Sequence, residues 1–353
     1  MLRFESASRR LADTAYTTNS SGQVLQCNLP KSGIYRWADI SFHGSLSTTF
    51  ASGSPAAPAE STIDSVISTI LCTAGDRTIK SVKPHMIHMQ EILASGQEGR
   101  RSSSAAASAV TNDLPTTDGG FVFGTTTQVS TVREELRIPF EMSLAKIGKE
   151  KTWLNLHKTT DNFLKFITSG FSGLDTTGAP VTYGGSGFTI ETYLEEVLGA
   201  NPKQDFFDYQ QLVAPTSVAA GVSDQEFQLR TGNFLAGIAL YVKNAASPSV
   251  AADLGLTTIK MGAGNNTSRY MDFNTEQGRM RREFDVNDKR ASAKARTDGF
   301  VFINLMTAGR DLNTAFDARG LNELKLLLSS HASATGPLNV YVEQHIIVQP
   351  KAG

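Results

Sequence analysis

The stretch 138–197 opens with IPFEMSL (138–144), continues as KTWLNLHKTTDNFLKFITSG (151–170) and closes with GFTIETYLEEV (187–197). The same order returns as FVFINLM (300–306), AGRDLNTAFDARGLNELKLLLSS (308–330) and LNVYVEQHIIV (338–348). Each copy gives an apolar strand, a Leu-Asn element in a short helical turn, a second apolar strand and a closing strand. A repeat this long and this rich in strand pattern indicates a duplicated β-domain, because solenoid repeats span only about 20–50 residues.

The segments that precede the two copies also correspond. In the first half, the alternating runs 23–29 and 34–44 lead to a hairpin around Gly75, and a short helix follows from Pro84. In the second half, a hairpin around Gly264-Asn265-Asn266 leads to a helix over 274–284. We expect Asn274 to be the N-cap of that helix.

Short strands separated by polar turns predict an all-β protein with short inserted helices. About eight strands in each half predict two tandem eight-stranded jelly rolls, a double jelly roll. We expect an N-terminal arm (1–20), a first jelly roll (21–200) and a second (201–353), with a linker near 199–224. The arm is either a short basic amphipathic helix or a frayed or locally docked terminus. The low-complexity segment 95–120 is expected to be a loop.

Composition narrows the class of protein. The chain has 353 residues, 33 basic against 34 acidic, and a net charge of -1. Its length favours two domains, and its charge balance gives no drive toward nucleic acid, so we expect no direct sequence-specific nucleic-acid binding. Cys27 and Cys72 form no pairing framework, which fits synthesis and folding in the cytoplasm. The sequence contains no run of about 18 apolar residues, which a membrane-spanning helix would need.

The sequence contains no catalytic constellation, so we predict that the protein is not an enzyme and needs no cofactor. His85 and His88 lie one helical turn apart and could bind a metal with Glu91, but packing or surface histidines are the favoured interpretation. The GGSG at 184–187 is interpreted as a flexible turn. The acidic cluster 191–196 alternates with apolar residues, which indicates the solvent face of a strand.

Two groups of residues are candidates for contacts with other molecules. Arg3, Arg9 and Arg10 of the arm could face a neighbouring subunit or an anionic membrane. The aromatic residues of FFDYQQL (206–212) and the basic stretch 279–296 are candidates for a subunit interface, although core burial and a solvated surface are the respective alternatives. From these segments we single out Phe206, Phe207, Tyr209, Arg281 and Arg282.

The repeated order of hairpin, short helix, long loop, strand, Leu-Asn turn and closing V-x-V-E strand resembles the double jelly-roll major capsid proteins. These come from tailless, membrane-containing icosahedral bacteriophages of the corticovirus and tectivirus type. The most specific likeness is the C-terminal segment LNTAFDARGLNELKLLLSSHASATGPLNVYVEQHIIV (312–348), whose rhythm is similar to the element before the last strand of that family.

The resemblance implies a structural major capsid protein of the virion, a homotrimer that forms a pseudo-hexameric capsomer and tiles an icosahedral shell over an internal membrane. The implied partners are neighbouring capsomers, penton and minor capsid or membrane proteins, and the membrane itself, near the N-terminal segment. The family supplies no catalytic residues, and no ligand set here matches the structural metal found in some relatives. The alternatives are a bicupin-like enzyme, which would need clustered histidines or carboxylates in a barrel, and a carbohydrate-binding module.

Overall fold

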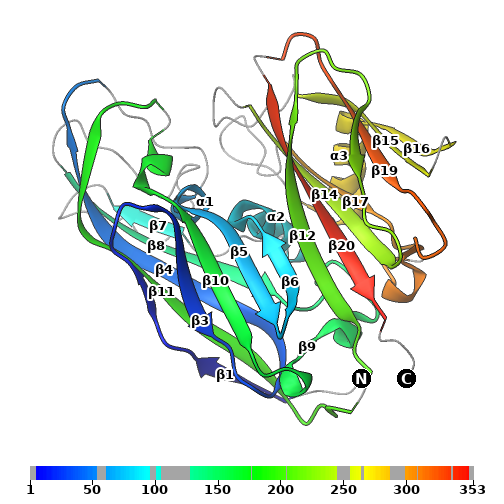
Figure 1. Ribbon diagram of the computed structural model, residues 1–353, viewed down its shortest axis with the longest axis horizontal. Helices are drawn as coiled ribbons and strands as arrows, with labels where there is room; N and C mark the ends of the chain where they lie inside the picture. Colours follow the sequence, from blue (N-terminus) through cyan, green and yellow to red (C-terminus); the bar gives the residue numbers. More distant parts are fainter. Residues whose placement is uncertain are drawn as a thin grey trace. The chain divides into compact units, whose positions relative to one another are not determined.

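The computed structural model (Figure 1) describes residues 5–53, 61–95, 101–104, 128–175, 177–203, 205–244, 255–263, 266–286, 299–307, 309–334 and 337–349. The chain forms two compact units. Unit 1 comprises Met1–His88, Glu98–Phe140 and Trp153–Gln204; unit 2 comprises Met89–Gln97, Glu141–Thr152 and Asp205–Gly353. The main change of unit, after Gln204, lies inside the segment expected as a linker.

Unit 1 contains two antiparallel sheets. The first runs in the order β1-β11-β4-β8-β7, with β2 beside β11 and β9 beside β4. Its strands are β1 (Glu5–Arg10), β2 (Thr14–Tyr16), β4 (Ile34–Phe50), β7 (Arg101–Ser104), β8 (Gln128–Pro139), β9 (Leu154–Asn155) and β11 (Val181–Leu198). The second sheet runs β6-β5-β10-β3, and its strands are β3 (Ser21–Asn28), β5 (Ile67–Ala74), β6 (Arg77–Val82) and β10 (Asn162–Ser169).

Unit 2 repeats this arrangement. One sheet runs β17-β14-β20-β12, with β18 beside β14, and the other runs β13-β19-β15-β16. The strands are β12 (Asp208–Val218), β13 (Gln225–Gln228), β14 (Phe234–Asn244), β15 (Leu256–Ala263), β16 (Asn266–Asp272), β17 (Phe300–Asn304), β18 (Phe316–Asp317), β19 (Lys325–Ser330) and β20 (Leu338–Val348).

The helical elements are short. They are α1 (Thr62–Val66), α2 (Pro84–Ser95), α3 (Phe273–Glu283) and the single turns η1 (Lys149–Thr152), η2 (Leu156–Lys158), η3 (Phe171–Leu174) and η4 (Leu312–Thr314). Both Leu-Asn elements of the sequence repeat lie at such turns, because Asn155 caps η2 and Asn313 lies within η4. Helix α2 begins at Pro84 as expected, since a missing N–H costs nothing in the first turn.

Strand order identifies the fold of each unit. Numbered along the chain, the eight principal strands of unit 1 are β1, β3, β4, β5, β6, β8, β10 and β11, and those of unit 2 are β12, β13, β14, β15, β16, β17, β19 and β20. In both units one sheet then reads 1-8-3-6 and the other 2-7-4-5. Two four-stranded sheets with these crossovers form a jelly roll. The prediction of a double jelly roll is confirmed.

Alternating burial explains why these segments form strands. In β10, every second side chain from Asn162 onward is buried, and the intervening ones are half-exposed. The unit 1 core includes Phe42 and Phe188 from neighbouring strands, with ring centroids 4.6 Å apart. Unit 2 has its own core, to which β14, β19 and β20 each contribute aliphatic residues. Each jelly roll therefore buries an apolar interior of its own.

Local expectations are confirmed in part. The described part of the arm is a locally docked terminus and not a helix, because β1 and β2 pair with β11. Pairing rather than burial orders β1, whose side chains are all exposed. The linker segment contains β12, and the predicted loop 95–120, otherwise mostly outside the described residues, contains β7. The N-cap of α3 is Asp272, whose carboxylate accepts from the Thr275 N–H at 3.0 Å, and not Asn274.

The GGSG segment is also not a flexible turn, because it lies inside β11 where the pairing with β4 shifts register. Gly187 has a φ of +72°, and a Cβ there would lie 2.3 Å from the Tyr16 carbonyl oxygen. A Cβ on Gly44, in β4, would lie 2.1 Å from the Gly187 oxygen. The glycines therefore allow a β-bulge at which three strands approach closely.

Candidate functional site

A buried carboxylate in unit 1 faces two imidazoles. Asp64, on the single turn of α1, has a side chain only 1% exposed. His85 and His88, one turn apart on α2, place their Nδ1 atoms 3.1 Å from Asp64 Oδ2 and 3.2 Å from Asp64 Oδ1. Burial alone would raise the pKa of Asp64, but attraction to His88 and hydrogen bonds from both rings outweigh it and hold the pKa well below its usual range.

The short helix that carries Asp64 is held by a second buried carboxylate. Glu134 of β8 is fully buried and accepts from the backbone N–H groups of Thr62 and Ile63 at 2.8 and 2.9 Å. Ser61 caps the same turn by accepting from the Asp64 N–H at 3.2 Å. A five-residue helix is unstable alone, so these contacts fix its position. The histidine pair is therefore part of a structural cluster that joins α1, α2 and β8.

A chain of buried polar groups runs across β12 and β20 of unit 2. The Tyr209 hydroxyl lies 2.6 Å from His345 Nδ1, and His345 Nε2 lies 2.7 Å from Glu343 Oε1, which also accepts from Gln211 at 3.0 Å. The Gln90 amide on α2 donates to Glu343 as well. Burial and the nearby Glu343 charge raise the pKa of Tyr209 well above its usual value, so the phenol keeps its proton. The direction of its hydrogen bond to His345 depends on which imidazole nitrogen is protonated.

The order hydroxyl, imidazole and carboxylate is formally that of a nucleophile, base and orienting acid. However, Tyr209 is 5% exposed, and His345 and Glu343 are fully buried. A substrate could not reach the phenol without opening the sheet. The contact between His345 and Glu343 also has the distance of an ion pair without the direction of a linear hydrogen bond. The arrangement is thus suited to fixing the packing of β12 against β20 and not to catalysis.

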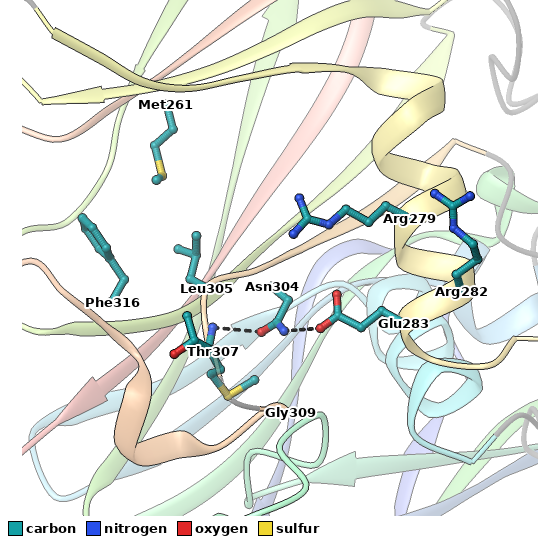
Figure 2. A pocket seen from close by; sticks show the side chains of 10 residues that line it. Met261, Arg279, Arg282, Glu283, Asn304, Leu305, Thr307, Gly309 and Phe316 are labelled. Atoms are coloured by element: carbon teal, nitrogen blue, oxygen red, sulfur yellow. Dashed lines mark hydrogen bonds between the residues drawn. The ribbon is translucent and has the colours of Figure 1, made fainter.

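A concave site of unit 2 lies beside α3 (Figure 2) and has a volume of about 720 Å³. It is lined by Met261, Arg279, Arg282, Glu283, Asn304, Leu305, Met306, Thr307, Gly309 and Phe316. Figure 2 shows Arg279 extending from the helix toward the side of the pocket formed by Met261, Leu305 and Phe316. The Asn304 amide donates to the Glu283 carboxylate and its oxygen accepts from the Met306 N–H at 2.9 Å. The pocket therefore combines an apolar wall with a cationic one.

The structure describes two of the three arginines of the arm that were predicted to contact other molecules. Arg3 lies outside the described residues, whereas Arg9 and Arg10 lie on β1 with exposed side chains. Arg10 forms ion pairs with Asp13 at 2.9 Å and Glu191 at 3.1 Å. The structure thus shows a basic strand end on the surface of unit 1, and its contact with another molecule stays a prediction.

The other predicted contact residues lie in unit 2. Phe206 and Tyr209 are buried within the chain, and the half-buried Phe207 ring lies 5.9 Å from Lys151 Nζ. Arg281 and Arg282 occupy the last turn of α3, where cations complement the helix dipole. Only Arg282 lines the pocket. The rest of the basic stretch, 287–296, lies outside the described residues.

Sequence reasoning missed Asp64, Glu134 and the pocket. A signal for Asp64 existed, because Ser61 and Asp64 have the S-x-x-D spacing of a capping motif before an apolar run. The spacing of Arg279 and Arg282 places both on one helix face, but nothing in the sequence shows the Met261 and Phe316 side chains opposite. The predicted solvent face of β11 is confirmed, because Glu191, Glu195 and Glu196 are half-exposed whereas Thr192 and Leu194 are buried.

Among the described residues, no three histidine, cysteine or acidic side chains come together as a metal-binding group. His85 and His88 instead face Asp64. In the same part of the chain, no helix combines the length and apolar character needed to cross a membrane.

No protein-family profile and no curated protein sequence matches this chain. Several solved structures, however, are similar to this chain. The major capsid protein of STIV, the Sulfolobus turreted icosahedral virus, superposes with a TM-score of 0.66 over 98% of this chain and 97% of its own, at 13% identity. The major capsid protein P2 from bacteriophage PM2 gives 0.56 over 99% and 100%, at 11% identity. The mavirus major capsid protein gives 0.51 over 97% and 87%, also at 11% identity.

These likenesses span both units and between 87% and 100% of each of the three proteins. At such low identities they show fold and not shared residues. The chain has the double jelly-roll fold of viral major capsid proteins.

Proposed function

We propose that this protein is a major capsid protein whose homotrimers form the pseudo-hexameric capsomers of an icosahedral, phage-type virion. The observation that carries the proposal is the strand order, 1-8-3-6 and 2-7-4-5, repeated in both units over almost the whole chain. Full-length similarity to three viral major capsid proteins supports it. The inaccessible Tyr209, His345 and Glu343 offer nothing to the rival bicupin-like enzyme.

The duplicated fold suits this role for a geometric reason. Three copies of a chain with two similar units present six similar edges, so one gene product can occupy near-hexagonal positions in a lattice. Contacts between capsomers can then be individually weak, because a shell sums them over many neighbours. A net charge of -1 leaves little long-range repulsion between copies.

Oligomeric state tests the proposal directly. Light scattering on the purified full-length protein should give a mass three times that of the 38.0 kDa chain, and negative-stain images should show triangular or hexagonal particles. A monodisperse monomer across the accessible concentration range would sink the capsomer proposal. The interface residues are tested in the same assay: Phe207→Asp should weaken the trimer if this half-buried ring lies between subunits.

The remaining partners are part of the same proposal. The shell would lie over an internal membrane, with the arm that carries Arg3, Arg9 and Arg10 toward it, and would contact penton and minor capsid or membrane proteins. The exposed Arg9 side chain on β1 supports attraction to anionic headgroups, whereas the Arg10 charge is offset by Asp13 and Glu191. Flotation with phosphatidylserine vesicles at low salt should recover the wild type and less of Arg9→Glu. Equal recovery of both would remove the arm from membrane contact, and the trimer assay would be unaffected.

A further inference from the structure

The pocket beside α3 has the size and lining of a ligand site. Small-molecule sites occupy roughly 300–1,000 Å³ and are mostly apolar with a few polar groups, and this one measures about 720 Å³. We propose that it binds an amphiphile that joins an apolar body to one anionic group, a carboxylate or a phosphate. The proposal concerns unit 2 alone and does not depend on capsid assembly.

The apolar body would lie against side chains that belong to the core of unit 2. Met261 of β15 and Leu305, just after β17, are core members, and Phe316 of β18 packs against that core. Met261 is only 4% exposed although it lines the cavity, so most of its side chain is packed inside the protein. An apolar wall backed by a packed core does not collapse into the cavity, and covering it with an apolar ligand removes that surface from water, which favours binding.

The anionic group would meet Arg279. This side chain is 60% exposed, and the ion pair it forms within the described part of the chain, with Glu276, is long at 3.9 Å. Arg282, three residues later on the same helix, adds a second positive charge to the lining. Figure 2 shows the Arg279 guanidinium between the helix and the apolar side chains, which is where the head of an amphiphile would lie.

The one acidic side chain in the lining does not cancel this charge. Glu283 accepts from the Asn304 amide and attracts Arg310, whose guanidinium stacks 4.4 Å from the centre of the Phe284 ring. Burial lowers the pKa of Arg310, and the Glu283 charge acts against that shift. With Glu283 directed to these partners, the two arginines give the pocket a net positive lining. An anionic head is favoured over a neutral or cationic one.

The structure also suggests how to block the site. Thr307 is exposed and lines the pocket, and its backbone N–H and C=O groups bond to the Thr314 hydroxyl. Thr307→Trp would fill the cavity without removing a core side chain. Arg279→Ala would remove the head contact. Arg281→Ala is the matched control, because it removes the same charge from the same helix at a position outside the lining.

The test uses the full-length protein and calorimetric titration with octanoate, octan-1-ol, inorganic phosphate and phenyl phosphate. We expect octanoate and phenyl phosphate to bind one per chain, and octan-1-ol and inorganic phosphate to bind at least tenfold more weakly. Arg279→Ala should weaken octanoate about tenfold, as the loss of one charge-assisted contact predicts. Thr307→Trp should abolish binding and Arg281→Ala should preserve it, with unchanged circular dichroism in all three variants.

Three results would overturn the proposal: no binding of either amphiphile at millimolar concentration, equal binding of octanoate to wild type and Thr307→Trp, or inorganic phosphate as tight as phenyl phosphate. Once octanoate binding is established, vesicles that contain phosphatidate identify the source of the ligand. Their capture by wild type and not by Thr307→Trp would support a membrane lipid. Failure of capture would support a free amphiphile. Neither result depends on whether trimers form.

Discussion

The two units share a strand order but differ in the length of their strands. In unit 1, β4 and β11 have 17 and 18 residues, whereas their counterparts β14 and β20 have 11 each. Strand β3 has 8 residues and its counterpart β13 has 4. The order of the strands depends on which faces must be buried, whereas the length of the strands does not. The duplication therefore preserved topology while the ends of the strands, and the surfaces they carry, diverged.

Buried charge differs in the same way. Unit 1 places Asp64 between two imidazoles at a helix, and unit 2 places Glu343 among amides and one imidazole on its closing strand. Neither cluster has its counterpart at the same strand position. Buried polar groups need specific partners, so each unit could fix its packing with a different set without altering its sheets.

The largest expected effect compares two glycines on the matching strands β4 and β14, each of which has another part of its own unit close to its Cα atom. Gly44→Ala in β4 sets a Cβ 2.1 Å from a backbone oxygen, whereas Gly237→Ala in β14 sets one 2.2 Å from the tip of the Phe302 ring. A backbone cannot move aside but a ring can shift, so we expect losses of about 3 and 1–2 kcal/mol, respectively. Urea unfolding measures both free energies. Equal losses would show that the two central strands are equally constrained.

Expectation and structure agree where local chemistry and burial act together. The hairpin at Gly75, the start of α2 at Pro84 and the closing strands β11 and β20 were all predicted, because turn residues and alternation select the same outcome as packing. Local preference alone misled at β12, where Pro215 and its small neighbours suggested a linker. Eleven residues there pair with β20, and this pairing is a tertiary contact that propensity does not contain.

In the candidate sites, too, residue type could be predicted from the sequence and the partners brought by tertiary contacts could not. Arg281, Arg282 and Tyr209 could be singled out by residue type, but the partners of Tyr209 come from a strand 136 residues away. The capping signal at Asp64 is easily missed, because α1 leads directly into the apolar run that forms β5 and the helix is held by Glu134 from a distant strand. Pockets form where distant segments meet, so Met261, Arg279 and Phe316 carry no shared signal in the sequence.

The second prediction concerns the buried charge of unit 1. Replacing Asp64 by Asn removes a charge-assisted contact to two imidazoles and should cost about 2 kcal/mol at pH 7. The folded pKa of Asp64 is depressed, so its contribution is present above the unfolded value near 3.9 and is lost as pH falls through the folded value. Urea unfolding at pH 7 and pH 3 should show the gap between wild type and Asp64→Asn narrowing in acid. A gap that is constant with pH would mean that the carboxylate charge is not the stabilising group.

The smallest effect has the opposite sign. Gly278 lies inside α3, and a Cβ there meets nothing within 4 Å. Gly278→Ala should raise the free energy of unfolding by about 1 kcal/mol, because alanine loses less backbone entropy in a helix. A rise in the urea midpoint at unchanged slope would agree, and a fall would show that α3 needs the glycine for a contact with another molecule. The same Gly-to-Ala exchange would then stabilise at Gly278 and destabilise at Gly44, because the neighbours of each glycine, and not the residue itself, decide the outcome.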